Sequence, residues 1–316
     1  MPDGRSNHGH ERGNPDDGRA SGCFGVDSRR MSPPRTDPRL PDLRFVSVDT
    51  LIPHERHDEQ RMVPLTRKLR EQGILKNPPI VAPLDHEGAP RERFVVLDGA
   101  NRAMAAKAAG LPHLVVQVVA YREPDVELST WFHALVGYPH DELGLKLAAI
   151  PGLECHPETL PHARAVLARR EALAYVVCGD GCVDTLHGGT DLPSRNDLLN
   201  AIVDAYRGDT RFLRVASDSL AAAQARHPDV TALVVFPHFE PDEVIELATS
   251  GARLPAGITR HLVRWRALRL NIPLERLAEG SQSLGVKNQW LKDWAQEKLR
   301  QRQVRFYQEP TVLFDE

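Results

Sequence analysis

The sequence predicts an α+β protein in which a compact unit, residues 41–124, precedes a larger mixed α/β region, residues 125–316. Two observations carry this prediction. Residues 94–110 are typical of a short apolar strand, a glycine-containing turn and an alanine-rich helix that stops at Gly110. Around them, short apolar runs and one amphipathic stretch give the order strand, loop, helix, strand, strand, helix, strand, which indicates a compact α+β unit.

The expected helix that precedes this turn covers residues 64–73. It has Pro64 in its first turn, leucines on one face and Gly73 as its stop. A polar, hairpin-like loop is expected at residues 84–93. The expected strands of the unit are residues 43–52, 78–82, 94–97 and 114–119.

The turn itself, Asp98-Gly-Ala-Asn-Arg102, has the residues of an anion site. Gly99 allows a sharp change of direction, and Asp98 or Asn101 can cap the helix that follows. The backbone N–H groups of the first helical turn, with the guanidinium of Arg102 beside them, suit a phosphate or a carboxylate. An ordinary capped strand-to-helix turn is the alternative.

The region after residue 124 alternates further helices and strands. A hairpin around the turn at residues 179–181 and a buried strand at residues 229–236 are its clearest strand signals. A final strand is expected at residues 305–314. The expected helices cover residues 160–173, 191–206 and 241–251, and a helical stretch covers residues 272–303.

The second informative stretch is strongly basic. Residues 252–269 hold five arginines and one histidine, and no acid occurs from residue 247 to residue 274. A loop of this composition, with a glycine and a threonine at its centre, suits a polyanion, although a solvated basic face gives the same pattern.

Composition sets limits on the class of protein. Of 316 residues, 41% are hydrophobic and 26% are charged, as in a soluble protein of about two domains, and the net charge of −3 provides no basic field for nucleic acid. No apolar run approaches the roughly 20 residues of a membrane span, and the N-terminus lacks a signal-peptide core. Because four cysteines are too few for a disulfide framework in so long a chain, we expect a cytoplasmic protein.

The first 40 residues predict a disordered tail. They contain 6 Gly and 5 Pro among mixed charges and almost no apolar residues, so they cannot bury enough surface to offset the entropy lost on ordering. A metal site is not expected from Cys178 and Cys182, because no second ligand pair follows them.

The spacing of these elements resembles the superfamily of ParB-like and sulfiredoxin-like domains. The motifs that carry the resemblance are Gly73-Ile74, Pro79-Ile80-Val81, Gly99-Ala-Asn-Arg102 and Ala109-Gly110-Leu111. Within this superfamily, free serine kinases carry Asp-Gly-x-x-Arg in the turn and a His-Glu pair after the first strand. The chain has both, so it is most similar to free L-serine kinases of the SbnI type, which serve siderophore biosynthesis.

The resemblance implies transfer of a phosphoryl group from ATP or ADP to the hydroxyl of L-serine, which gives O-phospho-L-serine, with Mg²⁺ as cofactor. It implies that Glu55 is the general base and that Asp98 is a second catalytic residue that binds Mg²⁺ or the substrate. The residues implied to hold the nucleotide phosphates are Gly99, Ala100, Asn101, Arg102 and His54. Archaeal serine kinases have two histidines in place of Ala100 and Asn101, so the choice between ATP and ADP stays open.

The resemblance implies that two further segments contact the amino acid substrate. Serine kinases have an aromatic residue near the amino acid, at about the position of Trp131, which is otherwise explained as a core anchor. They also have a late segment that contributes to the active site, and here it corresponds to residues 255–261. Thr259, Arg260 and His261 are the residues implied to contact the substrate or the phosphates, so residues 125–316 would complete the active site.

Three other functions share these features. A ParB-like, nucleotide-dependent DNA-binding protein or transcription regulator would need a helix-turn-helix and a basic surface after the first unit. A sulfiredoxin-type reductase would need a cysteine at the position of Ala100. A non-catalytic sensor of nucleotide or amino acid is the third. The expected partners are L-serine and a nucleotide, without a membrane or nucleic acid, and a homodimer stays open.

Overall fold

The computed structural model describes residues 40–56, 59–84, 92–122 and 124–307, and shows a mixed α/β protein, as predicted. The expected tail at residues 1–40, apart from its last residue, and the expected loop at residues 84–93, apart from its ends, lie outside the described residues. Among the described residues, no helix combines the length and the apolar character needed to cross a bilayer.

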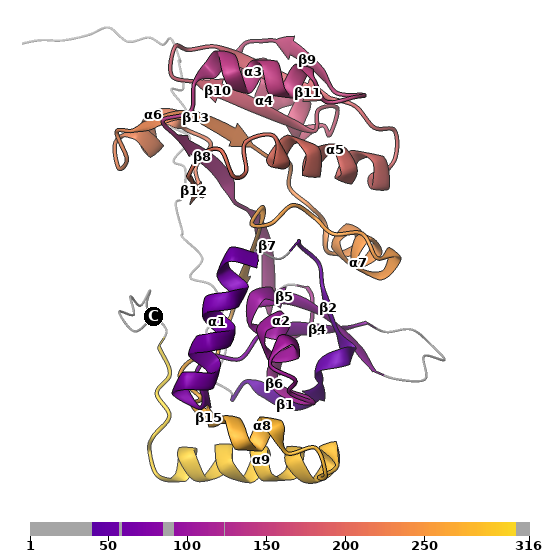
Figure 1. The fold of residues 1–316 in the computed structure, drawn as a ribbon, viewed down its shortest axis with the longest axis vertical. Helices are drawn as coiled ribbons and strands as arrows, with labels where there is room; N and C mark the ends of the chain where they lie inside the picture. The colour runs from indigo at the N-terminus through magenta and orange to yellow at the C-terminus, as the bar shows by residue number, and fades with distance from the viewer. Residues whose placement is uncertain (1–39, 57–58, 85–91, 123, 308–316) are drawn as a thin grey trace, which may run out of the picture. The chain divides into compact units, whose positions relative to one another are not determined.

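The compact unit is built on a five-stranded sheet in the order β1-β6-β4-β5-β2 (Figure 1). The pairs β1–β6 and β4–β5 are antiparallel, and β4–β6 and β2–β5 are parallel. Its strands are β1 (Asp42–Ser47), β2 (Leu51–Pro53), β4 (Ile80–Leu84), β5 (Arg93–Asp98) and β6 (His113–Val118).

The single strand expected at residues 43–52 is broken in two. A 3₁₀ turn, η1 (Val48–Thr50), separates β1 from β2, and these two strands lie at opposite edges of the sheet. The Thr50 hydroxyl donates to Ser47 O at 2.7 Å, and the Val48 N–H donates to Pro112 O at 3.2 Å. The first bond is local and the second reaches the segment before β6, and both satisfy backbone groups at the break between the strands.

The helix expected at residues 64–73 starts earlier. The helix α1 (Glu59–Gln72) contains Pro64 in its interior rather than in its first turn, and Gly73 follows it with φ +63°. The proline removes one backbone hydrogen bond of the helix, a cost that packing against α2 (Ala100–Ala108) offsets.

Both faces of this sheet are covered. On one face, Phe45, Phe94 and Val116 pack with α2 and with two C-terminal helices, α8 (Leu274–Ala278) and α9 (Leu284–Arg300). On the other face, Ile52, Val95 and Leu97 pack with Val126 and Ala248 from the second half of the chain. The compact unit therefore completes its core with residues far outside its own sequence range.

The second half contains a six-stranded sheet in the order β12-β8-β13-β10-β11-β9. The expected hairpin is confirmed, because β10 and β11 pair antiparallel, and the buried strand expected at residues 229–236 is β13. The strands are β8 (Phe132–Val136), β9 (Glu154–Pro157), β10 (Ala174–Cys178), β11 (Val183–His187), β12 (Phe212–Val215) and β13 (Val230–Val235).

Helices lie on both faces of this second sheet. One core cluster holds residues of α3, α5 and α7, and the opposite cluster holds residues of α4 and α6. The expected helix at residues 160–173 ends at residue 168, because Arg170 takes a positive φ of 61° and reverses the chain. The helices are α3 (His140–Ala148), α4 (Leu160–Ala168), α5 (Leu192–Asp204), α6 (Leu220–Gln224) and α7 (Pro241–Ser250).

Two short sheets connect distant segments. The strand β7 (Val126–Thr130) pairs with β14 (Thr259–Val263), so the middle of the basic stretch at residues 252–269 is a strand rather than a loop. The strand β15 (Ile272–Pro273) pairs with β3 (Ile74–Leu75) directly after Gly73. The helical stretch expected at residues 272–303 is α8 and α9, separated by residues 279–283.

The long helix α9 lies along the edge strand β1 (Figure 1). Asn288 bonds both backbone groups of Phe45 there: its Oδ1 accepts from the Phe45 N–H at 2.7 Å, and its Nδ2 donates to Phe45 O at 3.1 Å. The side chain thus satisfies part of the open edge as a neighbouring strand would. No strand forms at residues 305–307, and the remainder of the expected final strand lies outside the described residues.

We expect Asn288→Ala to lower the free energy of unfolding by about 1–3 kcal/mol, because it leaves two half-buried backbone groups without their partner. Urea unfolding followed by circular dichroism measures this. The control is Gln289→Ala on the exposed side of the same helix, whose side chain bonds only Asp293 on the surface. Equal stability of the two variants would contradict the role given to Asn288.

Candidate active site

The parallel pairing of β2 with β5 brings the two predicted site segments together. In this pair Pro53 lies opposite Val96, so the chain leaves both strands at the same edge of the sheet. His54 and Glu55 follow β2, and the turn at residues 98–102 follows β5. Both segments line one cavity of about 680 Å³, a size within the roughly 300–1,000 Å³ of small-molecule sites.

Glu55 is held by the loop that precedes β14. Its Oε2 accepts from the Gly257 N–H at 2.8 Å, and its Oε1 accepts from the Thr259 N–H at 2.8 Å and from the Thr259 hydroxyl at 2.5 Å. Backbone bonds from Arg56 N to Leu254 O and from Leu254 N to His54 O, both 2.8 Å, align the two segments. The carboxylate therefore has a fixed orientation at the cavity wall.

His54 is buried beside Glu55. Its Nδ1 donates to Val96 O at 2.5 Å, and its Nε2 lies 2.7 Å from the Thr259 hydroxyl oxygen. That hydroxyl carries a single proton and lies between Nε2 of His54 and Oε1 of Glu55. Thr259 therefore joins the His-Glu pair in one hydrogen-bonded group.

His261 packs edge to face on His54, with ring centroids 5.1 Å apart, and its Nε2 lies 2.8 Å from the hydroxyl of Tyr121. Burial, together with the charge of His54, holds the pKa of His261 well below its ordinary value of 6.5, against a hydrogen bond to the Leu97 backbone that raises it. Burial and the charge of Glu55 raise the pKa of Tyr121. At neutral pH both rings are uncharged, so they wall the Glu55 group without adding a cation.

The turn after β5 has the expected glycine but a different polar arrangement. Gly99 is the N-cap of α2 with φ +86°, and a Cβ there would lie 3.1 Å from Pro79 Cα. Because a glycine caps the helix, neither Asp98 nor Asn101 occupies the expected capping position. Oδ2 of Asp98 instead accepts from Arg102 at 3.2 Å and from Arg266. The two guanidinium groups compete successfully for this carboxylate.

Positive charge dominates the cavity lining. Its acids are Glu55 and Asp98, against the basic side chains of Arg56, Lys68, Lys76, Arg102, Arg214, Arg260 and Arg266. The predicted site residues did not include Arg56, Lys68, Lys76, Arg214 or Arg266. Arg266 lies within the basic stretch that was recognised, whereas Lys68 and Arg214 carry no local signal. A cavity with this balance of charge suits a polyanionic ligand.

Trp131 and Arg260 meet at the cavity wall. The pairing of β7 with β14 places Thr130 opposite Thr259, and the Trp131 N–H donates to Ile258 O at 2.8 Å. The Arg260 guanidinium carbon lies 4.5 Å from the centre of the Trp131 ring, a cation–π contact. Both side chains line the cavity, and so do Thr259 and His261. All the predicted site residues are therefore brought to one place.

Gly257 takes a backbone conformation that residues with a side chain rarely adopt. It has φ +81°, and a Cβ would lie 2.2–2.3 Å from the guanidinium group of Arg214. Its carbonyl accepts from Nε2 of His133 at 3.3 Å, and Tyr206 bonds the other ring nitrogen at 2.7 Å. Burial lowers the pKa of His133 to about 3, so the ring stays neutral and its tautomer supports Gly257.

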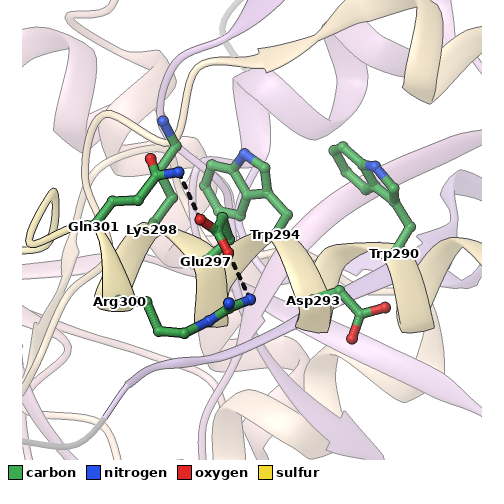
Figure 2. A pocket seen from close by; sticks show the side chains of 7 residues that line it. All are labelled: Trp290, Asp293, Trp294, Glu297, Lys298, Arg300 and Gln301. Carbon is green, nitrogen blue, oxygen red and sulfur yellow. Dashed lines mark hydrogen bonds and ion pairs between the residues drawn. The ribbon is translucent and has the colours of Figure 1, made fainter.

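A second hollow lies on α9 (Figure 2). Its lining consists of Trp290, Asp293, Trp294, Glu297, Lys298, Arg300 and Gln301. Glu297 there pairs with Arg300 at 2.5 Å and accepts from Gln301 at 2.6 Å, so these polar groups satisfy one another. None of the predicted site residues takes part, and we assign this hollow no catalytic role.

We expect Gly257→Ala to lower the free energy of unfolding by roughly 1–3 kcal/mol, because alanine is strained at this positive φ, whereas the flexible end of Arg214 can move aside. Thermal denaturation measures the loss. Gly144→Ala in α3 is the control, since a Cβ there meets nothing within 4 Å and alanine favours a helix. A Gly257 variant as stable as the control would show that the loop can rearrange without cost.

No protein-family model matches the chain. A 93-residue stretch is 32% identical to an ATP-dependent L-serine kinase of Staphylothermus marinus and covers 29% of this chain and 35% of that protein. The chain therefore matches only about a third of the length of this relative. The ATP-dependent L-serine kinase SbnI of Staphylococcus aureus is 24% identical over 277 residues, which cover 87% of this chain and 97% of SbnI.

Solved structures share the fold. A C-terminally truncated SbnI from Staphylococcus aureus aligns with a TM-score of 0.61 at 21% identity, over 82% of this chain and 97% of that structure. A free serine kinase in complex with AMP aligns with a TM-score of 0.64 at 20% identity, over 77% of this chain and 98% of that structure. The resemblance to serine kinases that the sequence motifs indicated is confirmed by these relatives.

Proposed function

We propose that this protein is an ATP-dependent kinase of free L-serine, which forms O-phospho-L-serine. The observation that carries the proposal is the shared cavity of Glu55 and the turn at residues 98–102, with a carboxylate on one side and a helix N-terminus with arginines on the other. The relatives named ATP-dependent L-serine kinases support the reaction and ATP as the donor.

The nucleotide end of the cavity is proposed to be the first turn of α2. The leading backbone N–H groups of a helix point out of it and attract anions. Gly99, Ala100 and Asn101 lie at this position, and Arg102 adds a guanidinium fixed by Asn77 O at 3.1 Å. Phosphoryl transfer depends mainly on positioning and charge stabilisation, and these groups supply both.

Glu55 is proposed to be the general base. An ionised carboxylate offers about four lone-pair sites, and the loop around Gly257 and Thr259 uses three of them. The remaining capacity can accept the proton of a substrate hydroxyl. His54, which touches Thr259 from the other side, is proposed to keep the group aligned.

The reaction is an in-line displacement. The serine hydroxyl oxygen forms a bond to the γ-phosphorus while the bond from that phosphorus to the β–γ bridging oxygen breaks, and ADP leaves. The hydroxyl proton passes to the carboxylate of Glu55. Arg102 and Arg266 would balance negative charge on the phosphates. General-base catalysis by Glu55 would contribute about 10²–10⁴-fold to the rate.

Mg²⁺ fits this cavity on the protein side through Asp98. Magnesium sites of kinases commonly use one or two carboxylates together with the phosphates, and Asp98 is a carboxylate at the phosphate end of the cavity. The ion would neutralise phosphate charge. Asp98 would hold the ion, and Arg102 and Arg266, which donate to the same carboxylate, would bind the phosphates.

The amino acid is proposed to bind between Glu55 and the pair formed by Trp131 and Arg260. A guanidinium is the natural partner of the serine carboxylate, and the Trp131 ring restricts where that guanidinium can lie. Thr259 and His261 complete this wall, His261 as a neutral ring. Serine is small, which suits a subsite enclosed on several sides.

The domain division, the cellular location, the oligomeric state and the pathway are further proposals. We propose that residues 41–124 form a ParB/sulfiredoxin-like domain and that residues 125–316 complete its site. A cytoplasmic location, a homodimer and a role in siderophore or other specialised amino acid biosynthesis remain predictions. The alternative, a nucleotide-dependent DNA-binding or transcription regulator, predicts retention of duplex DNA in a filter assay at moderate salt, whereas a serine kinase predicts none.

Purified protein with L-serine, Mg²⁺ and ATP is expected to yield O-phosphoserine, observed by phosphorus NMR, and Glu55→Gln is expected to lower kcat by about 10²–10⁴-fold because the base is lost. ADP in place of ATP tests the donor. Glu154→Gln on the exposed strand β9 is the matched control and should retain wild-type kcat.

The glutamine variant needs one further check. The side-chain NH₂ of the glutamine would face the backbone N–H of Gly257 or Thr259, which donates to Glu55 in the wild type. Circular dichroism and ATP binding by calorimetry must therefore show an intact fold. A folded Glu55→Gln protein with wild-type turnover would refute the base assignment, and absence of O-phosphoserine from wild type would refute the proposed function.

Arg266→Ala is expected to raise the KM for ATP and lower kcat/KM by roughly 10–100-fold, the effect of one lost charged hydrogen bond, while the KM for serine changes little. Steady-state kinetics with each substrate varied in turn measure this. Arg264→Ala is the control, because the Arg264 side chain is exposed, lies two residues away and does not line the cavity. An unchanged KM for ATP would mean that Arg266 only partners Asp98.

A further inference from the structure

Metal-ligating side chains gather in a part of the molecule that the proposed reaction does not use. His140, Asp180 and Cys182 offer ligand atoms that all lie within 4.8 Å of one another. His140 is the first residue of α3, and the other two belong to the turn that joins β10 to β11. The cluster therefore unites two segments separated by some 40 residues of sequence, and each segment is fixed by its own secondary structure.

The hairpin presents these groups through its sequence pattern. Cys178, Asp180, Cys182 and Asp184 occupy alternate positions, so possible ligands recur every second residue along the turn. The turn is closed by bonds from the Cys178 N–H to Cys182 O at 2.9 Å and from the Gly181 N–H to Cys178 O at 3.0 Å. The Cys182 N–H donates to Oδ1 of Asp180 at 3.0 Å, which sets this carboxylate beside the cysteine.

The two cysteines of the pattern have different surroundings. Cys178 is 1% exposed and packs in the hydrophobic core with residues of α3 and α5. Cys182 is exposed at the turn. Because only Cys182 can reach an ion without disturbing the core, the structure separates one available thiol from one structural thiol.

His140 lies between two carboxylates. Its Nδ1 is 3.3 Å from Oδ2 of Asp180, and its Nε2 is 4.0 Å from Oδ2 of Asp184. A histidine that binds a metal through one ring nitrogen commonly directs the other toward a carboxylate, which fixes the ring. Asp184 is positioned for that role, and Asp141 lies 4.0 Å from Nδ1 as the other nearby acid.

We propose that His140, Asp180 and Cys182 bind a divalent transition metal of the zinc class, with Asp184 as the partner of the imidazole. Bonds of about 2.0–2.3 Å in a tetrahedral site place ligand atoms roughly 3.3–3.8 Å apart, so the observed cluster needs only small side-chain rotations. One thiolate, one carboxylate and one neutral imidazole balance two positive charges. A thiolate and an imidazole favour zinc or cobalt over magnesium or calcium.

The consequence of metal binding is a bridge between α3 and the β10–β11 turn. A water molecule would supply the fourth ligand, because the two turn ligands are exposed and His140 is half-buried. Such a bridge would stabilise this edge of the second sheet. It does not depend on the proposed kinase reaction, since none of its residues lines the catalytic cavity.

Cobalt titration of the reduced, chelator-treated full-length protein tests the proposal. We expect one equivalent of Co²⁺ to give a thiolate-to-cobalt charge-transfer absorption with the visible bands of a tetrahedral site. Zn²⁺ should bleach these bands and raise the melting temperature. Cys182→Ser should abolish the charge-transfer absorption, His140→Ala should weaken binding, and Asp184→Asn should weaken it by about 10–100-fold while the absorption persists at saturation.

A double variant with Cys23 and Cys155 replaced by Ser is the matched control and should behave as wild type. Circular dichroism of each variant establishes that it is folded. The proposal is overturned if folded wild type gives no charge-transfer absorption, if that absorption survives Cys182→Ser, or if it disappears in the control variant.

Discussion

The carboxylate of Glu55, bonded to the loop before β14, is the interaction on which the candidate active site depends. Its acceptors join residue 55 to residues more than 200 positions later in the sequence. Together with the backbone bonds between residues 54–56 and Leu254, this contact fixes the loop beside the cavity. The contact also places a carboxylate with three hydrogen bonds at the wall of a cavity rich in cations, where an unsupported carboxylate would pair with an arginine.

Neutral rings surround this carboxylate. His133 supports Gly257 from behind, and His261 stands beside His54, and in both cases burial keeps the imidazole uncharged. These two neutral rings add no positive charge beside the group, whereas Nε2 of His54 lies 3.8 Å from Oε1 of Glu55. The positive charges that line the cavity come from its arginines and lysines.

Local sequence signals were sufficient to predict the strand, turn and helix around Gly99, because glycine, alanine and β-branched residues have strong intrinsic preferences there. The resemblance to a known family, rather than these local signals, assigned His54 and Glu55 to the same site as this turn. Local sequence signals failed where tertiary contacts determine the structure. Pro64 lies inside a helix because packing outweighs propensity, and Asp98 pairs with Arg266 from a distant loop instead of capping α2.

The same limit explains which site residues were missed. Lys68 looks like any exposed helical lysine, and Arg214 like any strand arginine, until the fold places them at the cavity. Arg266 was inside a recognised basic stretch, but composition does not say which of five arginines faces a ligand. The role of Gly257 is invisible in sequence, since it depends on the position of a guanidinium from another strand.

The helix α7 contributes to two hydrophobic clusters at once. Val244 and Leu247 pack in the core of the six-stranded sheet, while Ala248 packs under the five-stranded sheet with Ile52 and Leu97. Loss of either core would strip this helix of half its packing and so weaken the other. Residues 40–307 should accordingly melt as one cooperative transition, and a fragment cut at residue 124 would carry an uncovered apolar face into solution.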